Sequence, residues 1–180
     1  HWDNLAMQAE PNPTGRTQTD GTTTVTELDK TAENKGLVMN FISDVLMGNN
    51  PDALTTSFYG NSYIQHNPDM ADNLDGLGSA LAAWAEQGIT MVYDETHLLL
   101  GEGNFVLAAS SGTLSGVQTT FYDLFRVENG YIAGHWGVIE TLPAQSEWAN
   151  QNGKFGTGNT GDVPLPRTYQ LGVGTMQVYN

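Results

Sequence analysis

Four consecutive long segments with strand-like sequence restrict the folds open to this chain more than any other feature. They cover residues 90–101, 104–114, 116–127 and 131–141. The turn before the last of them is Glu128-Asn129-Gly130, and Asn-Gly is the strongest short hairpin signal. The four segments therefore predict an antiparallel meander of long strands.

Helical patterns precede these strands. Residues 31–48, 50–58 and 76–86 carry helical spacing or capping signals, and residues 62–66 predict a brief strand between the second and third helix. Helices first and a meander afterwards are typical of an α+β fold. Long bent strands with helices over one face make a cone, whose mouth is a natural pocket for a small molecule.

Composition divides the chain into three zones. Residues 29–155 carry dense, periodic apolar sequence, and the chain is 39% apolar, which is enough for a core. Residues 1–28 are polar and rich in Thr, Pro and Gly, as in an extended arm or linker. Residues 156–180 have a similar composition but end in strand-like alternation. We expect one domain over residues 29–155, with an extended arm or linker on its N-terminal side and an extended, strand-like arm on its C-terminal side.

Charge and cysteine content exclude several classes of protein. Asp and Glu outnumber Lys and Arg by 20 to 6, so the surface should repel nucleic acid and anionic membranes. Cysteine is absent, which excludes disulfides and cysteine-ligated zinc. The composition favours an extracellular, secreted protein, with an acidic cytoplasmic enzyme as the alternative. The Thr-rich run at residues 22–26 is a candidate for O-glycans.

Polar side chains that the pattern places in or near the pocket suggest acid–base chemistry. A carboxylate and an imidazole in one apolar cavity can exchange protons with a substrate. Asp123 stands in the middle of a predicted strand, a costly place for a charge unless it is paired or functional. The pocket candidates are Tyr63, His66, Asn67, His97, Tyr122, Asp123, His135 and Trp136.

The register of the last hairpin leaves one point open. A two-residue Asn-Gly turn places Asp123 opposite Trp136, one step from His135. A bulge would change that parity, so either His135 or Trp136 can face inward.

A purely structural explanation of the same residues stands beside the functional one. Asp123 can be satisfied by backbone amides or by Arg126, and a strand histidine is often only a hydrogen-bonded structural residue. The four histidines show no metal-ligand spacing, and no phosphate loop, nucleophile elbow or basic stripe is present. We therefore expect neither a metal nor a cofactor.

Five motifs follow one another between about residues 29 and 155. They are Ser62-Tyr63-Ile64-Gln65-His66-Asn67-Pro68, Asp75-Gly76-Leu77, Gly101-Glu102-Gly103-Asn104-Phe105-Val106, Phe121-Tyr122-Asp123-Leu124-Phe125-Arg126-Val127-Glu128-Asn129-Gly130 and His135-Trp136-Gly137-Val138-Ile139-Glu140. In this order they resemble the SnoaL-like polyketide cyclase family of the NTF2-like superfamily. The resemblance implies a cone in which a bent antiparallel sheet wraps on three N-terminal helices. It also implies cofactor-free aldol-type ring closure by an acid–base carboxylate.

Two features favour a structural role instead. The family usually reads His-Trp-Asp where this chain has His135-Trp136-Gly137, so one pocket carboxylate is missing. The chain also opens with His1-Trp2-Asp3, a partial echo of that last strand. Three explanations of this echo remain open. It is the remnant of an upstream copy of the same domain, a coincidence, or a strand that docks on a neighbouring molecule.

These observations support two hypotheses. The first is a self-assembling protein whose domains link head to tail into an extracellular filament through their arms. Its candidate assembly residues are His1, Trp2, Leu5, Tyr169, Leu171, Val173 and Val178. The alternative is a cofactor-free enzyme for a small apolar carbonyl substrate, as in cyclisation, aldol condensation or isomerisation. In that enzyme Asp123 is the base, and His66 or His135 acts on the carbonyl oxygen.

Overall fold

The computed structural model describes residues 10–58, 62–155, 169–171 and 174–176. Its main sheet has the strand order β1-β5-β4-β3-β2, in which all neighbours are antiparallel except β1 and β5. The sheet is therefore mixed and open rather than wholly antiparallel and closed. The strands are β1 (Ile64–Gln65), β2 (Met91–Glu102), β3 (Phe105–Leu114), β4 (Val117–Glu128) and β5 (Tyr131–Thr141).

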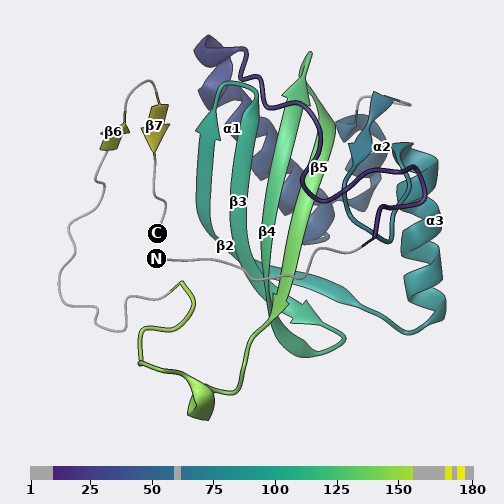
Figure 1. Ribbon diagram of the computed structural model, residues 1–180, viewed down its shortest axis with the longest axis vertical. Coiled ribbons are helices and arrows are strands. Elements are labelled where there is room, and N and C mark those ends of the chain that lie inside the picture. The colour runs from purple at the N-terminus through teal and green to yellow at the C-terminus, as the bar shows by residue number, and fades with distance from the viewer. Residues whose placement is uncertain (1–9, 59–61, 156–168, 172–173, 177–180) are drawn as a thin grey trace.

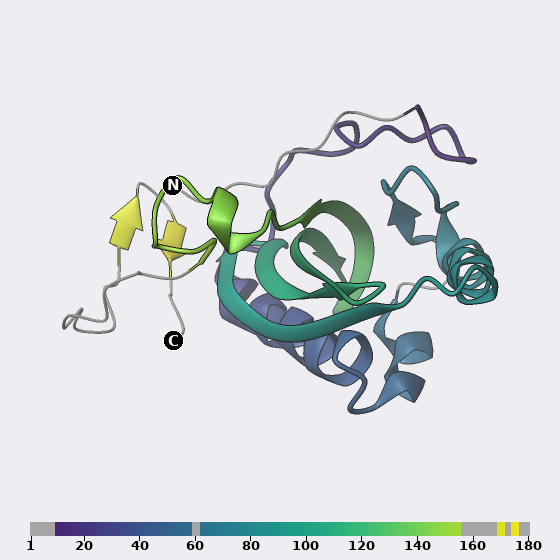
Figure 2. The ribbon, with the colours of Figure 1, turned by 90° about the horizontal axis from the view of Figure 1, so that it is seen from below.

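Helices cover one face of this curved sheet, as Figures 1 and 2 show. α1 (Thr31–Phe41) runs on into a turn of π-helix, Ile42–Leu46. A 3₁₀ turn, Pro51–Ala53, leads into the short α2 (Leu54–Ser57), and α3 (Asn73–Glu86) follows β1. This is the α+β cone that the resemblance implies, and the predicted helices and strands lie where the pattern puts them.

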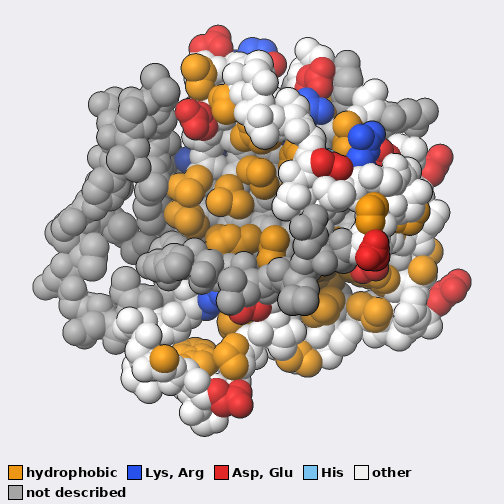
Figure 3. Space-filling view, viewed as in Figure 1, with side chains coloured by type: hydrophobic (Ala, Val, Ile, Leu, Met, Phe, Trp, Pro, Cys, Tyr) orange, Lys and Arg blue, Asp and Glu red, His pale blue; other side chains and the backbone are white. Residues whose placement is uncertain are grey.

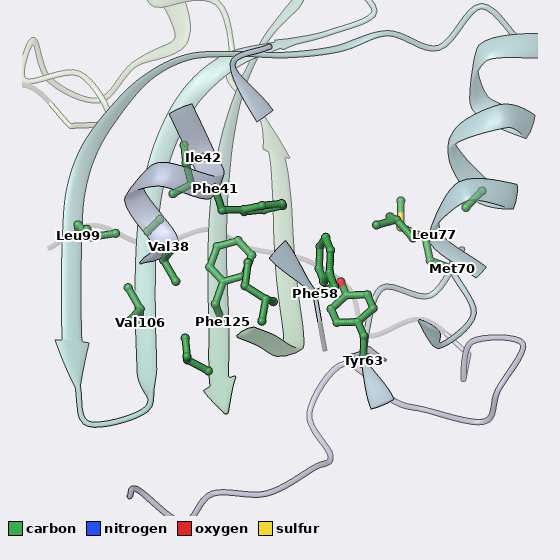
Figure 4. Packing of buried hydrophobic residues seen from close by; sticks show 14 residues of the cluster. Val38, Phe41, Ile42, Phe58, Tyr63, Met70, Leu77, Leu99, Val106 and Phe125 are labelled. Carbon is green, nitrogen blue, oxygen red and sulfur yellow. The ribbon is translucent and has the colours of Figure 1, made fainter. Parts of the chain in front are cut away.

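The core lies between α1 and the inner face of the sheet. Val38, Phe41 and Ile42 of the first helix pack with Leu99, Val106 and Phe125 of the strands (Figure 4). The Phe41 ring meets Phe58 edge-on at 5.2 Å and Phe125 at 5.7 Å between ring centroids. This aromatic cluster belongs to the core and also forms part of the wall of the cavity described below.

A bulge in β5 sets the register of the functional hairpin. Arg126 pairs with Gly134, whereas Val127 pairs with Ile132, so Ala133 is the extra residue. Asp123 consequently lies opposite Gly137, and not opposite Trp136 as in a hairpin without a bulge. The same shift turns His135 toward the inner face and Trp136 toward the outer one.

The N-terminal arm packs on its own domain over residues 10–26, crossing the side of the sheet away from α1 (Figures 1 and 2). Asn12 is buried, and its amide nitrogen donates to the carbonyl oxygens of Gln65 at 2.7 Å and Met70 at 2.8 Å. At the far end of the arm, Thr26 and Asn104 exchange two hydrogen bonds of 2.8 and 2.9 Å. This part of the chain is therefore fixed to the domain and is not a free linker.

A glycine and two stacked rings hold the middle of the arm. The His66 ring stacks on Trp136 at 4.2 Å, and Trp136 Nε1 donates to the carbonyl oxygen of Asp20. Gly21 has a φ of +110°, and a Cβ there would stand 2.7 Å from the Trp136 ring. Glycine is therefore required at this position, both for the positive φ and for the close approach of the backbone to the Trp136 ring.

The C-terminal zone contributes two short strands, β6 (Tyr169–Leu171) and β7 (Gly174–Met176), which pair with each other in antiparallel register. The predicted assembly residues His1, Trp2, Leu5, Val173 and Val178 lie outside the described residues, while Tyr169 and Leu171 belong to β6.

In the described parts of the chain, no helix is long and apolar enough to cross a membrane. Figure 3 shows apolar side chains gathered over the middle of the sheet, with acidic side chains nearer the edge.

Candidate active site

A cavity of about 260 Å³ opens between the inner face of the sheet and the helices. This size is slightly below the usual range for ligand pockets, which suits a small ligand. Its walls are mostly apolar and come from the π-helical turn, α2, α3 and the strands, with Val45, Leu46, Leu54, Leu77, Trp84, Ile89, Met91 and Ile139 among the lining residues. The polar lining residues are Tyr63, Gln65, Asn67, Tyr93, Asp123 and His135.

Asp123 and His135 form the centre of the polar group. Asp123 is only 3% exposed, and its Oδ1 lies 2.9 Å from His135 Nε2. Its Oδ2 accepts a hydrogen bond of 3.1 Å from the Tyr93 hydroxyl. Because the bulge brings His135 to the inner face, a buried carboxylate and an imidazole meet inside the cavity.

Gln65 determines which His135 nitrogen carries a proton. Its Oε1 accepts hydrogen bonds from the backbone N–H groups of His66 at 2.9 Å and Asn67 at 3.0 Å, which fixes the orientation of the amide. The same oxygen lies 3.2 Å from His135 Nδ1, so Nδ1 must be the donor. The hydrogen bond between His135 Nε2 and Asp123 Oδ1 also needs one proton, which either atom can carry. The pair is either an imidazolium and a carboxylate or a neutral imidazole and a carboxylic acid.

Gly137 leaves room for this pair. A Cβ at this position would stand 3.2 Å from His135 Cε1 and 3.5 Å from Asp123 Oδ1. A side chain here would require the imidazole to give way by a few tenths of an ångström, which would disturb its bond to Asp123. Gly137 therefore suits the close contact between Asp123 and His135.

Two tyrosines beside the pair are held in the protonated form. Burial, and then the negative charge of Asp123, raise the pKa of Tyr93 well above its usual range, and its hydrogen bond to Asp123 adds to this effect. Burial, followed by the charges of Asp123 and Asp72, raises the pKa of Tyr63. Both hydroxyls therefore remain donors throughout the neutral pH range.

The structure brings some of the sequence-predicted residues together and separates others. Asp123, His135, Tyr63 and Asn67 line the cavity. His66 does not: its ring faces the arm, with Nδ1 2.9 Å from both the Thr17 carbonyl oxygen and Asp20 Oδ1. His66 is therefore not placed to act on a carbonyl oxygen in the cavity.

Three further predicted lining residues lie on the outer face of the sheet. His97 stacks on Phe155 at 4.4 Å and lies 2.7 Å from the Ser111 hydroxyl. Tyr122 also stacks on Phe155, and Trp136 stacks on His66. Strand alternation explains the positions of Tyr122 and Trp136, because each neighbours an inward-facing residue in the sequence, whereas His97 lies at a register shift of β2.

Sequence reasoning missed Gln65 and Tyr93. Gln65 lies inside the motif that carries the resemblance, but the neighbouring histidine was the more obvious chemical group. Tyr93 lies on β2, where two register shifts, after Tyr93 and after Thr96, break the simple alternation. Its inward direction therefore had no clear signal in the sequence. Among the residues that the structure describes, no group of three His, Asp or Glu is placed to hold a metal ion.

The fold and the site define an open α+β cone with a buried carboxylate and an imidazole in contact inside it. Among solved structures, the chain is similar to an LEH-like epoxide hydrolase from M. tuberculosis, with 20% identity, 62% of this chain and 85% of that chain covered, and a TM-score of 0.45. It is similar to TsrD from Streptomyces laurentii, with 21% identity, coverages of 61% and 89%, and a TM-score of 0.43. An NTF2-like protein from Burkholderia xenovorans has 17% identity, coverages of 62% and 92%, and a TM-score of 0.47.

These likenesses concern the course of the chain and carry no argument about chemistry. No protein-family model matches the sequence, and no curated protein matches it. The function must therefore be argued from the cavity itself.

Proposed function

We propose that this protein is a cofactor-independent acid–base enzyme that acts on a small, mostly apolar carbonyl compound. The Asp123–His135 pair removes a proton from the carbon next to the carbonyl group. The resulting enolate either attacks a second carbonyl group of the same molecule, closing a ring, or is reprotonated at another carbon, giving an isomer. The abstracted proton returns to the product, so neither course needs an oxidant or a reductant.

The observation that carries this proposal is a buried carboxylate that meets an imidazole on the wall of an apolar cavity. Arg126, the cation expected to neutralise Asp123, instead pairs with Glu128 at 2.7 Å. Asp123 is held by His135 and Tyr93 and lines the cavity. Burying a charge is costly unless it is paired, and a carboxylate whose partner is a histidine in a cavity is typical of catalytic sites.

The lining also supports the substrate class. Lys and Arg are absent from the lining residues that the structure describes, so an anionic substrate would meet Asp123 without a lysine or arginine partner. The apolar walls favour a hydrocarbon skeleton. Hydrogen bonds join most of the polar lining residues into one group, where the reacting group would lie.

Proton exchange in heavy water tests the proposal without knowledge of the natural substrate. Small cyclic ketones and β-diketones are incubated with the protein in D₂O, and NMR follows the loss of the signal from protons next to the carbonyl group. We expect faster exchange with the wild type for at least one compound and loss of that acceleration in Asp123→Asn. Removing an essential general base usually costs about 10²- to 10⁴-fold.

Asp52→Asn is the matched control, because it makes the same chemical change at an exposed position. It should exchange as fast as the wild type. Wild-type rates in folded Asp123→Asn, or no acceleration by the wild type with any compound, would contradict the proposal.

A further inference from the structure

The proposed reaction places a negative charge on the substrate's carbonyl oxygen, and the Asp123–His135 pair has no donor to spare for it. One His135 nitrogen bonds Gln65 Oε1 and the other bonds Asp123 Oδ1. The Tyr93 hydroxyl donates to Asp123 Oδ2. The donor for the carbonyl oxygen must therefore come from other lining residues.

Asn67 offers such a donor. Its side chain is buried, with 9% exposure, and lines the cavity. Its Oδ1 accepts the backbone N–H of Asp69 at 2.9 Å, which fixes the orientation of the amide. Nδ2 then faces away from that bond and has no hydrogen-bond partner among the described residues. Because Asn67 lines the cavity, a ligand atom there that accepts from Nδ2 would supply the partner that the described residues do not give it.

Tyr63 offers a second donor. It is 1% exposed and lines the same cavity. Its oxygen accepts a hydrogen bond of 2.8 Å from Gln65 Nε2, while its own proton has no acceptor in the described part of the chain. Figure 4 shows the ring packed beside Phe58, and the two centroids are 4.4 Å apart. This packing holds the hydroxyl in one place.

We infer that Asn67 Nδ2 and the Tyr63 hydroxyl together bind the carbonyl oxygen of the substrate and stabilise the enolate oxygen that forms from it. The two residues flank β1, and Gln65 of that strand is paired with His135 of β5. The two donors and the acid–base pair are thus carried by neighbouring strands. Preorganised donors of this kind act most strongly in a cavity that excludes water. The inference rests on the proposed function and adds the subsite that receives the charge.

Binding of 2-naphthol tests this subsite without turnover. Its phenolate oxygen has the charge distribution of an enolate, whereas 2-methoxynaphthalene has the same rings and cannot ionise. Fluorescence titration should show that the wild type binds the naphthol more tightly than the ether. Asn67→Asp keeps the acceptor for Asp69 and removes the donor, and Tyr63→Phe removes the other donor without adding a charge. Each variant should weaken naphthol binding about tenfold or more and change ether binding by less than about twofold.

The control is Asn40→Asp, the same substitution at an exposed position of α1, which should bind both compounds like the wild type. Circular dichroism checks the fold of each variant, and Tyr63→Phe carries the test if Asn67→Asp does not fold. Equal affinity of the wild type for the two compounds, or unchanged naphthol binding in Tyr63→Phe, would overturn the inference. The exchange experiment tests Asp123 and the naphthol titration tests Asn67 and Tyr63, so a failure of the proposed function can be told apart from a failure of the subsite.

Discussion

Gln65 controls the protonation of the site although it does not itself titrate. Two backbone N–H groups hold its Oε1 against His135, so the amide cannot turn its NH₂ group toward the imidazole. The hydrogen-bond pattern therefore requires a proton on His135 Nδ1. This places the reactive proton on the side of Asp123, where the cavity lies.

The first prediction concerns this nitrogen. Nitrogen-15 NMR of the ring should show a protonated Nδ1 in the wild type at neutral pH. Gln65→Leu, which removes the acceptor, should let the signal move toward an unprotonated Nδ1, whereas Gln65→Glu keeps an acceptor and should retain the proton. An unprotonated Nδ1 in the wild type would show that the hydrogen-bond assignment is wrong.

The second prediction follows from the raised pKa values of Tyr63 and Tyr93. Each folded tyrosine keeps its proton at a pH where the unfolded chain has lost it. Their contribution to stability is therefore complete below about pH 10 and is lost as the pH rises beyond it, by about 1.4 kcal/mol per pH unit for each tyrosine. Urea denaturation between pH 9 and 11 should show this decline.

The double variant Tyr63→Phe/Tyr93→Phe supplies the comparison for this pH dependence. It removes both groups, so its free energy of unfolding should fall less steeply with pH than that of the wild type. Parallel curves for the two proteins would mean that these tyrosines do not cause the decline.

At the scale of elements, the sequence was sufficient to predict where the helices and strands lie. It was insufficient to predict which residues of the last strand face the cavity. The last strand was predicted at its observed bounds, because the Asn-Gly turn and the apolar alternation mark both ends. The bulge at Ala133 has no comparable signal, yet it decides that His135 and not Trp136 enters the cavity. Asp123 and His135 were predicted as site residues, but their pairing depends on that single inserted residue.

The contacts of the N-terminal arm could not be predicted from the sequence. Its Thr-, Pro- and Gly-rich composition indicates an extended chain but does not show what the chain contacts. Its contacts come from single polar residues such as Asn12 and from ring stacking around Gly21, and neither produces a periodic pattern. Because residues 10–26 bind their own domain, this segment gives no support to head-to-tail assembly.

The third prediction tests that attachment. Asn12→Ala removes the donor to two buried carbonyl oxygens, so we expect the free energy of unfolding to fall by about 2–3 kcal/mol. Thr23→Ala, at an exposed position of the same arm, should change it by less than about 0.5 kcal/mol. Urea denaturation measures both. Equal effects of the two substitutions would mean that the arm is not part of the cooperative folding unit.

At the scale of the whole molecule, excess negative charge opposes folding. The chain has a net charge of -14, and compaction brings these charges together. Four cations in the described residues form ion pairs, which involve Arg16, Lys30, Arg126 and Lys154. Pairs of this kind contribute about 0–1 kcal/mol each and are themselves weakened by salt. The repulsion between the remaining carboxylates extends over the whole surface and should dominate the response to salt.

The fourth prediction is therefore that sodium chloride stabilises the protein. Raising its concentration from 10 to 500 mM shortens the screening length from about 30 Å to less than about 8 Å, which removes most of the long-range repulsion. We expect the free energy of unfolding to rise by about 1 kcal/mol or more. The variant Glu86→Gln/Asp94→Asn removes two exposed charges, one of them at the unfavourable C-terminal end of α3. It should be more stable than the wild type at 10 mM salt and gain less from added salt. A wild type that loses stability as salt rises would show that the ion pairs outweigh the repulsion.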